Sequence, residues 1–158
     1  MQVLILYYSK SGNTKKLAEA VVRGVESIGV KAVLKNTREV TREDFLDSAG
    51  IIAGSPVYFG TMASDLKRVF DEFVGVRKKM ENKVGAAFTT SGHPTGGKET
   101  TIMSIFQAML IYGMIIVGDP FSASGHYGVA CEGAPDERAG RDAFQLGVRV
   151  AELCRKLQ

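Results

Sequence analysis

Three hydroxyl side chains, a glycine and an asparagine stand together in the stretch SKSGNT, residues 9–14. This stretch lies between an apolar run that predicts a buried strand and a segment with helical periodicity. Free backbone N–H groups at a helix N-terminus, together with the helix dipole, bind anions. The hydroxyl groups add donors, and Gly12 lets the backbone curl tightly. A phosphate site is therefore one interpretation, and a well-capped turn is the other. The chain has neither the GxxxxGK of a Walker loop nor the GxGxxG of a dinucleotide site.

Two adjacent aromatic residues mark a second stretch, GSPVYFG, residues 54–60. Tyr58 and Phe59 stand between a turn that Pro56 makes rigid and the glycine that follows. Aromatic rings at the open end of a strand are exposed unless a flat ligand covers them. The simpler alternative is that both rings pack beneath the loop.

Backbone donors and glycines dominate a third stretch, TTSGHPTGG, residues 89–97. Its glycines allow the main chain to approach a ligand closely. It also carries His93, one of only two histidines in the chain.

Short apolar runs alternate with helical patterns along the whole chain. The runs that predict strands are residues 3–8, 30–34, 50–54, 84–88 and 114–117. Helical periodicity predicts helices over residues 14–28, 62–74, 98–112 and 136–156, and a capping box at Thr41 and Asp44 predicts a short one. Five strands joined by helices indicate parallel crossovers in a doubly wound α/β sheet.

Ligands of such sheets bind beyond the carboxyl ends of the strands, where the strand order reverses. The three stretches follow the first, third and fourth predicted strands, so we expect them to meet at one edge. A phosphate cradle, an aromatic clamp and a donor-rich loop together describe a flat heterocycle with a single phosphate. Flavin mononucleotide (FMN) fits that description.

Composition narrows the class of protein. A chain of 158 residues suits a single domain over residues 1–158. The net charge of +3 comes from scattered lysines and arginines, so we expect no nucleic-acid partner. No apolar run approaches the roughly 18 residues of a spanning helix, so we expect no membrane span. Cys131 and Cys154 form no CxxC and no metal cluster, and no export signal precedes them, which indicates a cytoplasmic protein without a metal site.

Longer motifs carry a family resemblance. The phosphate loop of flavodoxins is similar to the stretch YSKSGNTKKLAEAV. The WrbA-type NAD(P)H:quinone oxidoreductases of the same superfamily are similar to four further stretches: GSPVYFGTMASDLKRVFDE, FTTSG, GGKETT and YGMIIVG. The resemblance covers about residues 2–118. It implies a flavodoxin-like three-layer sandwich, in which a five-stranded parallel sheet of order 2-1-3-4-5 has helices on both faces.

The resemblance also implies which residues contact FMN. Those that contact the phosphate are Ser9, Lys10, Ser11, Gly12, Asn13 and Thr14. Those that contact the flavin ring are Pro56, Val57, Tyr58, Phe59 and Gly60. Further contacts come from Thr90, Ser91, Gly92, His93 and Gly97. Tyr112, where the family often has histidine, is implied to approach the flavin within one subunit or across a subunit contact.

Three departures from the family pattern concern its substrates. The family usually has an aromatic residue where this chain has Ser11, which affects nicotinamide contacts. It commonly has a tryptophan that lines the quinone pocket, and this chain has none. ASGHYGV is similar to a trimmed Pro-Tyr-Gly region, which makes Tyr127 a candidate. Iron–sulfur flavoproteins share the second loop but need a compact cysteine cluster, which two distant cysteines exclude.

Two functions remain: a two-electron NAD(P)H:quinone oxidoreductase and a one-electron carrier of the flavodoxin type. Flavodoxins usually display many acidic residues, whereas the three loops here contain no Asp or Glu and do contain Lys10 and His93. Negative charge near the ring disfavours an anionic reduced flavin, so its absence favours two-electron chemistry. We expect a ping-pong reaction in which NAD(P)H is the donor and a quinone the acceptor. His93 could donate a proton or hydrogen bond to the quinone, or it could simply be a solvated loop residue.

The predicted helix 98–112 is apolar on more than one face, which predicts either deep burial or a subunit contact. We expect a homodimer or homotetramer. A redox protein is an alternative partner to a quinone, and no stretch selects NADH or NADPH.

Overall fold

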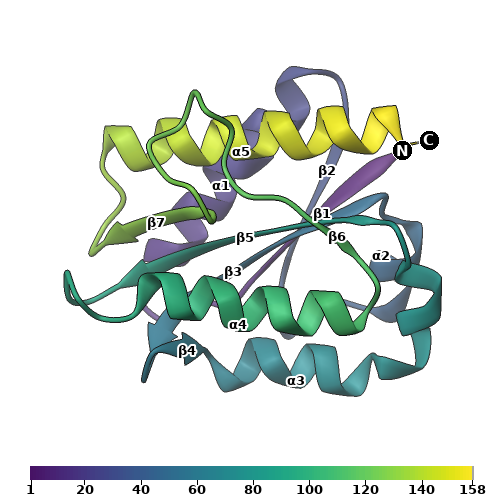
Figure 1. Cartoon of the computed structure of the whole chain (residues 1–158), viewed down its shortest axis with the longest axis horizontal. Coiled ribbons are helices and arrows are strands. Elements are labelled where there is room, and N and C mark those ends of the chain that lie inside the picture. The colour runs from purple at the N-terminus through teal and green to yellow at the C-terminus, as the bar shows by residue number, and fades with distance from the viewer. Residues whose placement is uncertain (158) are drawn as a thin grey trace.

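A computed structural model describes residues 1–157, in which a central sheet separates two layers of helices (Figure 1). The elements are, in order, β1 (Gln2–Tyr7), α1 (Asn13–Ser27), β2 (Lys31–Asn36), α2 (Arg42–Asp47), β3 (Gly50–Tyr58), β4 (Thr61–Met62), α3 (Ser64–Glu72), the 3-10 helix η1 (Val74–Met80), β5 (Val84–Ser91), α4 (Lys98–Ile111), β6 (Ile115–Ile116), β7 (Val129–Glu132) and α5 (Glu137–Lys156).

The parallel strands run in the order β2-β1-β3-β5-β6, which confirms the predicted order 2-1-3-4-5. The prediction of five strands was incomplete, because the sheet has seven. β4 pairs antiparallel with the end of β3, and β7 pairs parallel with the carboxyl half of β5. β6 pairs with the amino end of β5, so β6 and β7 share the outermost position of the sheet. Runs of two and four residues are too short to show periodicity.

Each face of the sheet has its own apolar core. α1 and α5 cover one face, and α2, α3 and α4 cover the other (Figure 1). On the first face, Leu17 and Val21 of α1 pack with Leu146 and Val150 of α5. On the second face, Phe45 of α2 contacts the rings of Phe70 in α3 and of Phe73, which follows it. Strands covered on both faces read as continuous apolar runs, as residues 3–6 do.

The predicted capping box is present at α2. The Asp44 N–H donates to Thr41 Oγ1 at 3.2 Å, and the Thr41 N–H donates to Asp44 Oδ2 at 2.8 Å. The predicted helix 62–74 is shorter in the structure, because Met62 pairs with Val57 in β4 and α3 starts at Ser64. The chain after α3 continues as η1.

α4 spans most of the predicted helix 98–112, and its two sides differ. Ile102, Ile105 and Met109 are buried against the sheet. Leu110 and Ile111 are 58% and 67% exposed, so burial in the subunit accounts for only part of its apolar surface.

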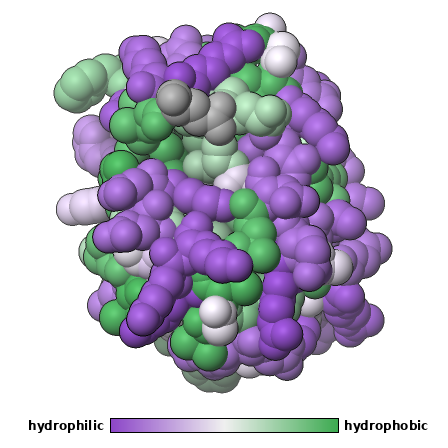
Figure 2. Space-filling model, turned by 90° about the vertical axis from the view of Figure 1, so that its right-hand side faces the viewer, coloured by the Kyte–Doolittle hydropathy of each residue, from purple (hydrophilic) through white to green (hydrophobic). Residues whose placement is uncertain are grey.

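The N-terminus and the C-terminal end of α5 lie at the end of the molecule where the parallel strands begin (Figure 1). Figure 2 shows that end, where hydrophilic side chains cover most of the surface. None of the described helices is both long and apolar enough to cross a membrane. The three loops of interest lie at the opposite end, beyond the carboxyl ends of β1, β3 and β5.

Candidate functional site

Two sets of contacts hold the three loops together. The hydroxyl groups of Thr14 and Thr90 are hydrogen-bonded at 2.9 Å and buried, which joins the first loop to the third. Thr100 Oγ1 donates to the Gly60 carbonyl at 2.6 Å and lies 3.0 Å from that of Gly97, which joins the second loop to the third. A Cβ on Gly97 would lie 2.9 Å from the Gly60 Cα, so this approach requires glycine. The structure therefore brings together residues that are far apart in sequence.

The first loop presents free donors at the start of α1. No side chain caps this helix, and its first turn has no acidic residue. Within residues 1–157, the N–H groups of Asn13, Thr14 and Lys15 have no hydrogen-bond acceptor. Gly12 has φ +94°, and a Cβ there would point into open space. A helix end with free N–H groups, the positive pole of its dipole and room in front of it fits a phosphate.

The second loop is more strand-like than the sequence indicated, because β3 continues through Pro56 and Val57 to Tyr58. Phe59, with φ +51°, and Gly60 then form a tight turn into β4. The Phe59 ring is fully exposed, which is not the packed arrangement that was the alternative interpretation. The Tyr58 ring is partly exposed and meets Tyr8 edge-to-face, with 6.3 Å between ring centroids. Partial burial, with the neighbouring Tyr8, raises the pKa of Tyr58.

The third loop also begins inside a strand, because β5 extends to Ser91, and Thr90 and Ser91 are buried. Gly92 and His93 follow and are exposed. The Thr95 N–H donates to His93 Nδ1 at 3.2 Å. A ring nitrogen that accepts carries no proton, so the neutral His93 ring has its proton on Nε2, where it can donate.

Tyr112 does not join these loops. It follows α4 at the end of the sheet where β5 begins, next to Gly113, whose carbonyl accepts from the Asn82 N–H at 2.9 Å. Its side chain is 4% exposed, and its hydroxyl donates to the Phe70 carbonyl at 2.5 Å. Burial raises its pKa to about 12. The structure gives Tyr112 a place in the core, away from the three loops, and its approach to the flavin stays a prediction.

Two contributors to the site were not predicted from the sequence. Tyr8 contacts the ring of Tyr58, and Thr100 ties two loops together. Tyr8 looked like the last residue of a strand, and Thr100 looked like a helix residue. The contacts of Tyr8 and Thr100 are with residues of other elements, so only the tertiary structure shows them.

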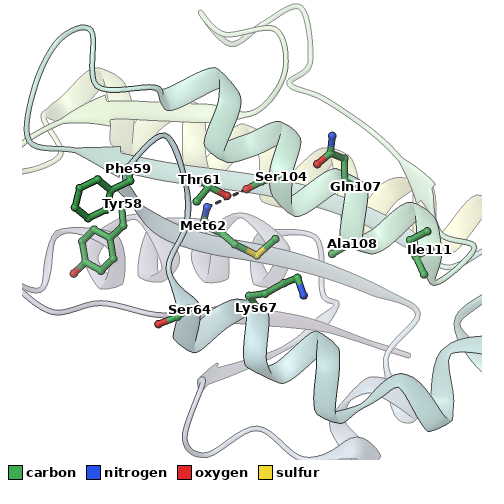
Figure 3. A pocket seen from close by; sticks show the side chains of 10 residues that line it. All are labelled: Tyr58, Phe59, Thr61, Met62, Ser64, Lys67, Ser104, Gln107, Ala108 and Ile111. Carbon is green, nitrogen blue, oxygen red and sulfur yellow. Dashed lines mark hydrogen bonds between the residues drawn. The ribbon is translucent and has the colours of Figure 1, made fainter.

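An apolar groove of about 700 Å³ begins at the second loop and runs between α3 and α4 (Figure 3). Tyr58 and Phe59 stand at one end of the groove and Ile111 at the other. The Met62 N–H donates to Ser104 Oγ at 3.0 Å and fixes β4 against α4.

A doubly wound sheet of this order, with free N–H groups in the first loop and aromatic residues in the second, is typical of the flavodoxin-like class of FMN proteins. Comparison with known sequences agrees, since the profile of the NADPH-dependent FMN reductase family matches residues 33–128. The chain belongs to this family.

Relatives with assigned names cover nearly the whole chain. An NAD(P)H dehydrogenase (quinone) of Archaeoglobus fulgidus is 35% identical over 99% of this chain and 98% of its own. A flavodoxin of Aquifex aeolicus is 36% identical over 96% of this chain and 85% of its own. A WrbA-like flavodoxin of Agrobacterium tumefaciens has the same fold, with a TM-score of 0.87 and 22% identity over 99% of both chains. These similarities confirm the resemblance to WrbA-type proteins and support FMN as the cofactor.

Proposed function

We propose that the protein is an FMN-dependent oxidoreductase that takes electrons from NAD(P)H and passes two of them to a quinone. The observation that carries this proposal is the meeting of three donor-rich loops, free of Asp and Glu, at one edge of the sheet. Membership in the FMN reductase family and the quinone-dehydrogenase names of several relatives support it. Residues 1–158 form a single FMN-binding domain in this proposal.

The chain's own residues bind and orient the cofactor. The N–H groups of Asn13 and Thr14 and the hydroxyl groups of Ser9 and Ser11 hold the phosphate, with Lys10 nearby. The backbone of residues 56–60 and residues 90–93, with Gly97, borders the ring. Bound FMN supplies the hydride-accepting and electron-donating chemistry. Because these loops lack carboxylates, no negative charge in them would repel a negative charge on reduced FMN.

His93 supplies a hydrogen-bond donor for the quinone. Its Nδ1 accepts from Thr95, so its Nε2–H is free to donate to a quinone oxygen. NAD(P)H and the quinone bind at the flavin one after the other, which predicts ping-pong kinetics. The reaction requires no side chain as an obligatory acid or base.

A flavodoxin-type electron carrier is the second candidate, because flavodoxins are among the similar proteins. In that case the acceptor is a redox protein. The net charge of +3 and the absence of acidic loop residues favour the enzyme.

An anaerobic reduction experiment tests the proposal. FMN-loaded protein is mixed with NADH and, separately, with NADPH, and the flavin absorbance is followed. The enzyme is expected to bleach rapidly in one phase and to recover its colour when a quinone is added. If neither nucleotide bleaches the flavin although dithionite does, the protein is a carrier. If FMN does not bind, the phosphate-site interpretation of residues 9–14 is wrong.

We also propose that the protein self-associates in the cytoplasm as a homodimer or homotetramer. Ile111 of α4 lines the apolar groove that reaches Phe59, and Leu110 beside it in sequence is also exposed. A second copy that covers this surface would bury the apolar side of α4 and shield the ring from water. Cys131 and Cys154 are unpaired thiols, which fits a reducing compartment.

A further inference from the structure

A second pocket lies beside the first loop, on the side that faces β2. Its volume is about 420 Å³. Ser9, Lys10 and Gly12 line one side, and the turn that follows β2 lines the other. Tyr7 and Tyr8 also line it, and Tyr8 contacts Tyr58 of the second loop. The pocket is therefore continuous with the proposed flavin site but lies outside the three loops.

The charges that line this pocket have one sign. Lys10, Lys15 and Arg38 contribute three cations, and no carboxylate is among the lining residues. Lys15 Nζ lies 3.9 Å from Glu19 on the next turn of α1, a long and exposed pair that offsets little of its charge. Within residues 1–157, the Arg38 guanidinium has no hydrogen bond or ion pair. An anionic ligand would meet donors that are not already committed.

The turn that carries Arg38 is well ordered by its own contacts. The Arg38 N–H donates to Asn36 Oδ1 at 2.8 Å, and the Thr37 N–H donates to the Tyr7 carbonyl at 3.0 Å. From α3, Arg68 Nη2 donates to the Thr37 carbonyl at 3.1 Å. A fixed backbone holds the base of the Arg38 side chain in place, which lowers the entropy lost when it binds a ligand.

We propose that this pocket binds the 2′-phosphate of NADPH and so selects NADPH over NADH. The inference rests on the proposed function and adds the electron donor to it. The α1 N-terminus is the site proposed for the FMN phosphate, so a cation set beyond that site suits a second phosphate monoester. Arg38 presents a planar fork that matches phosphate oxygens, and Lys15 adds a point charge. Tyr8 lines the pocket and also contacts Tyr58 of the second loop, which connects the pocket to the proposed flavin site.

A pair of ligands that differ only in the 2′-phosphate tests the proposal without turnover. Binding of 2′,5′-ADP and of 5′-AMP to FMN-loaded protein is measured by calorimetry. We expect 2′,5′-ADP to bind about 10-fold more tightly, which is the size of one hydrogen-bonded charge pair. Arg38→Gln and Lys15→Gln should each remove most of that difference. Lys16→Gln is the matched control, because Lys16 is also a cation of α1 but does not line the pocket.

Each outcome decides a separate claim. Equal binding of the two ligands by the parent protein, or an unchanged difference in Arg38→Gln, overturns the subsite. A loss of FMN affinity in Arg38→Gln also overturns it, because the pocket then belongs to the FMN phosphate. If 2′,5′-ADP binds through Arg38 but NADPH does not reduce the flavin, the subsite stands and the proposed donor is wrong. In a working enzyme, Arg38→Gln should lower the NADPH-to-NADH ratio of kcat/KM about 10-fold through KM.

Discussion

At the scale of single residues, His93 shows how a neighbour sets the chemistry of a side chain. The sequence leaves open whether this histidine is functional or only solvated. The Thr95 N–H occupies Nδ1, so the proton of the neutral ring is on Nε2. The His93 ring can therefore donate a hydrogen bond to a quinone oxygen. When that oxygen becomes negatively charged during reduction, such a hydrogen bond contributes about 1.5–3 kcal/mol.

We predict that His93→Ala slows quinone reduction about 10-fold or more while FMN reduction by NAD(P)H is nearly unchanged. The two half-reactions are measured separately by stopped flow, because ping-pong kinetics separates them. His126→Ala is the control, since His126 is the other histidine and lies outside the three loops. An unchanged oxidative half-reaction in His93→Ala would leave this residue without a role.

At the scale of elements, the N-terminus of α1 is built for a ligand rather than for stability. It has no capping side chain and no acid in its first turn, whereas α2 has a full capping box. α5 likewise has an N-cap, because the Ala139 N–H donates to Asp136 Oδ1 at 2.8 Å. An uncapped helix start forgoes about 1 kcal/mol. Bound phosphate supplies the missing acceptor.

The isosteric change Asn13→Asp should therefore have opposite effects on stability and on binding. A carboxylate in the first turn is favourable to the helix dipole, so the apo protein should gain about 0.3–1 kcal/mol in unfolding free energy. The same charge repels the FMN phosphate, so FMN affinity should fall about 10-fold or more. Chemical denaturation and flavin-fluorescence titration measure the two effects. Asn82→Asp, far from the site, should change neither; a loss of both stability and affinity in Asn13→Asp would contradict this account.

At the scale of the whole molecule, the segment between β6 and β7 carries a buried charge that affects stability. Both carboxylate oxygens of Asp119 are buried, and the nearby Gly128 N–H makes no well-aligned hydrogen bond to them. Burial, with the charge of Asp142 nearby, raises the pKa of Asp119 to about 6, although Arg149, the Gly128 N–H and His126 oppose the shift. The folded protein then holds a proton between about pH 4 and 6 that the unfolded chain has released.

Unfolding free energy should fall as the pH rises through that window, because the folded state binds more protons there. Asp119→Asn should remove this fall and stabilise the protein above pH 6 by about 1 kcal/mol, a value reduced for the partial exposure of the group. Denaturant melts at several pH values measure it. Asp47→Asn, at an exposed position, should leave the pH profile unchanged. A profile that is the same in Asp119→Asn and the parent would show that Asp119 does not control it.

The apolar surface of α4 bears on how whole molecules associate. Leu110→Lys places a charge in the proposed contact, so we expect light scattering to show a shift toward monomer. Val74→Lys, at a residue that is 53% exposed on η1, should keep the parent mass. A parent protein that is monomeric with FMN bound would contradict self-association.

Most of the fold could be predicted from the sequence, because the features that define it are local. The apolar run of β1, the periodicity of α1 and the capping pair of Thr41 and Asp44 each act over a few residues. β4 and β7 could not be predicted, since each is short and exists only because β3 or β5 lies beside it. The predicted strands 50–54 and 84–88 end several residues before β3 and β5 do, for the same reason. Ser55 and Pro56 are strand residues because they pair with Thr89 and Thr90.

The sequence by itself determined the alternation of strands and helices, the order of the loops and the donor types in each, because strand periodicity and loop composition are written in neighbouring residues. The sheet order was implied only by the resemblance to a known family. The tertiary structure decided which of those residues meet. It joined Thr14 to Thr90, placed Tyr8 against Tyr58, buried Tyr112 at the other end of the sheet and gathered Lys15 with Arg38. Such contacts depend on how far each strand extends and on which side of its strand or helix each side chain lies. Packing between elements that are distant in sequence determines both.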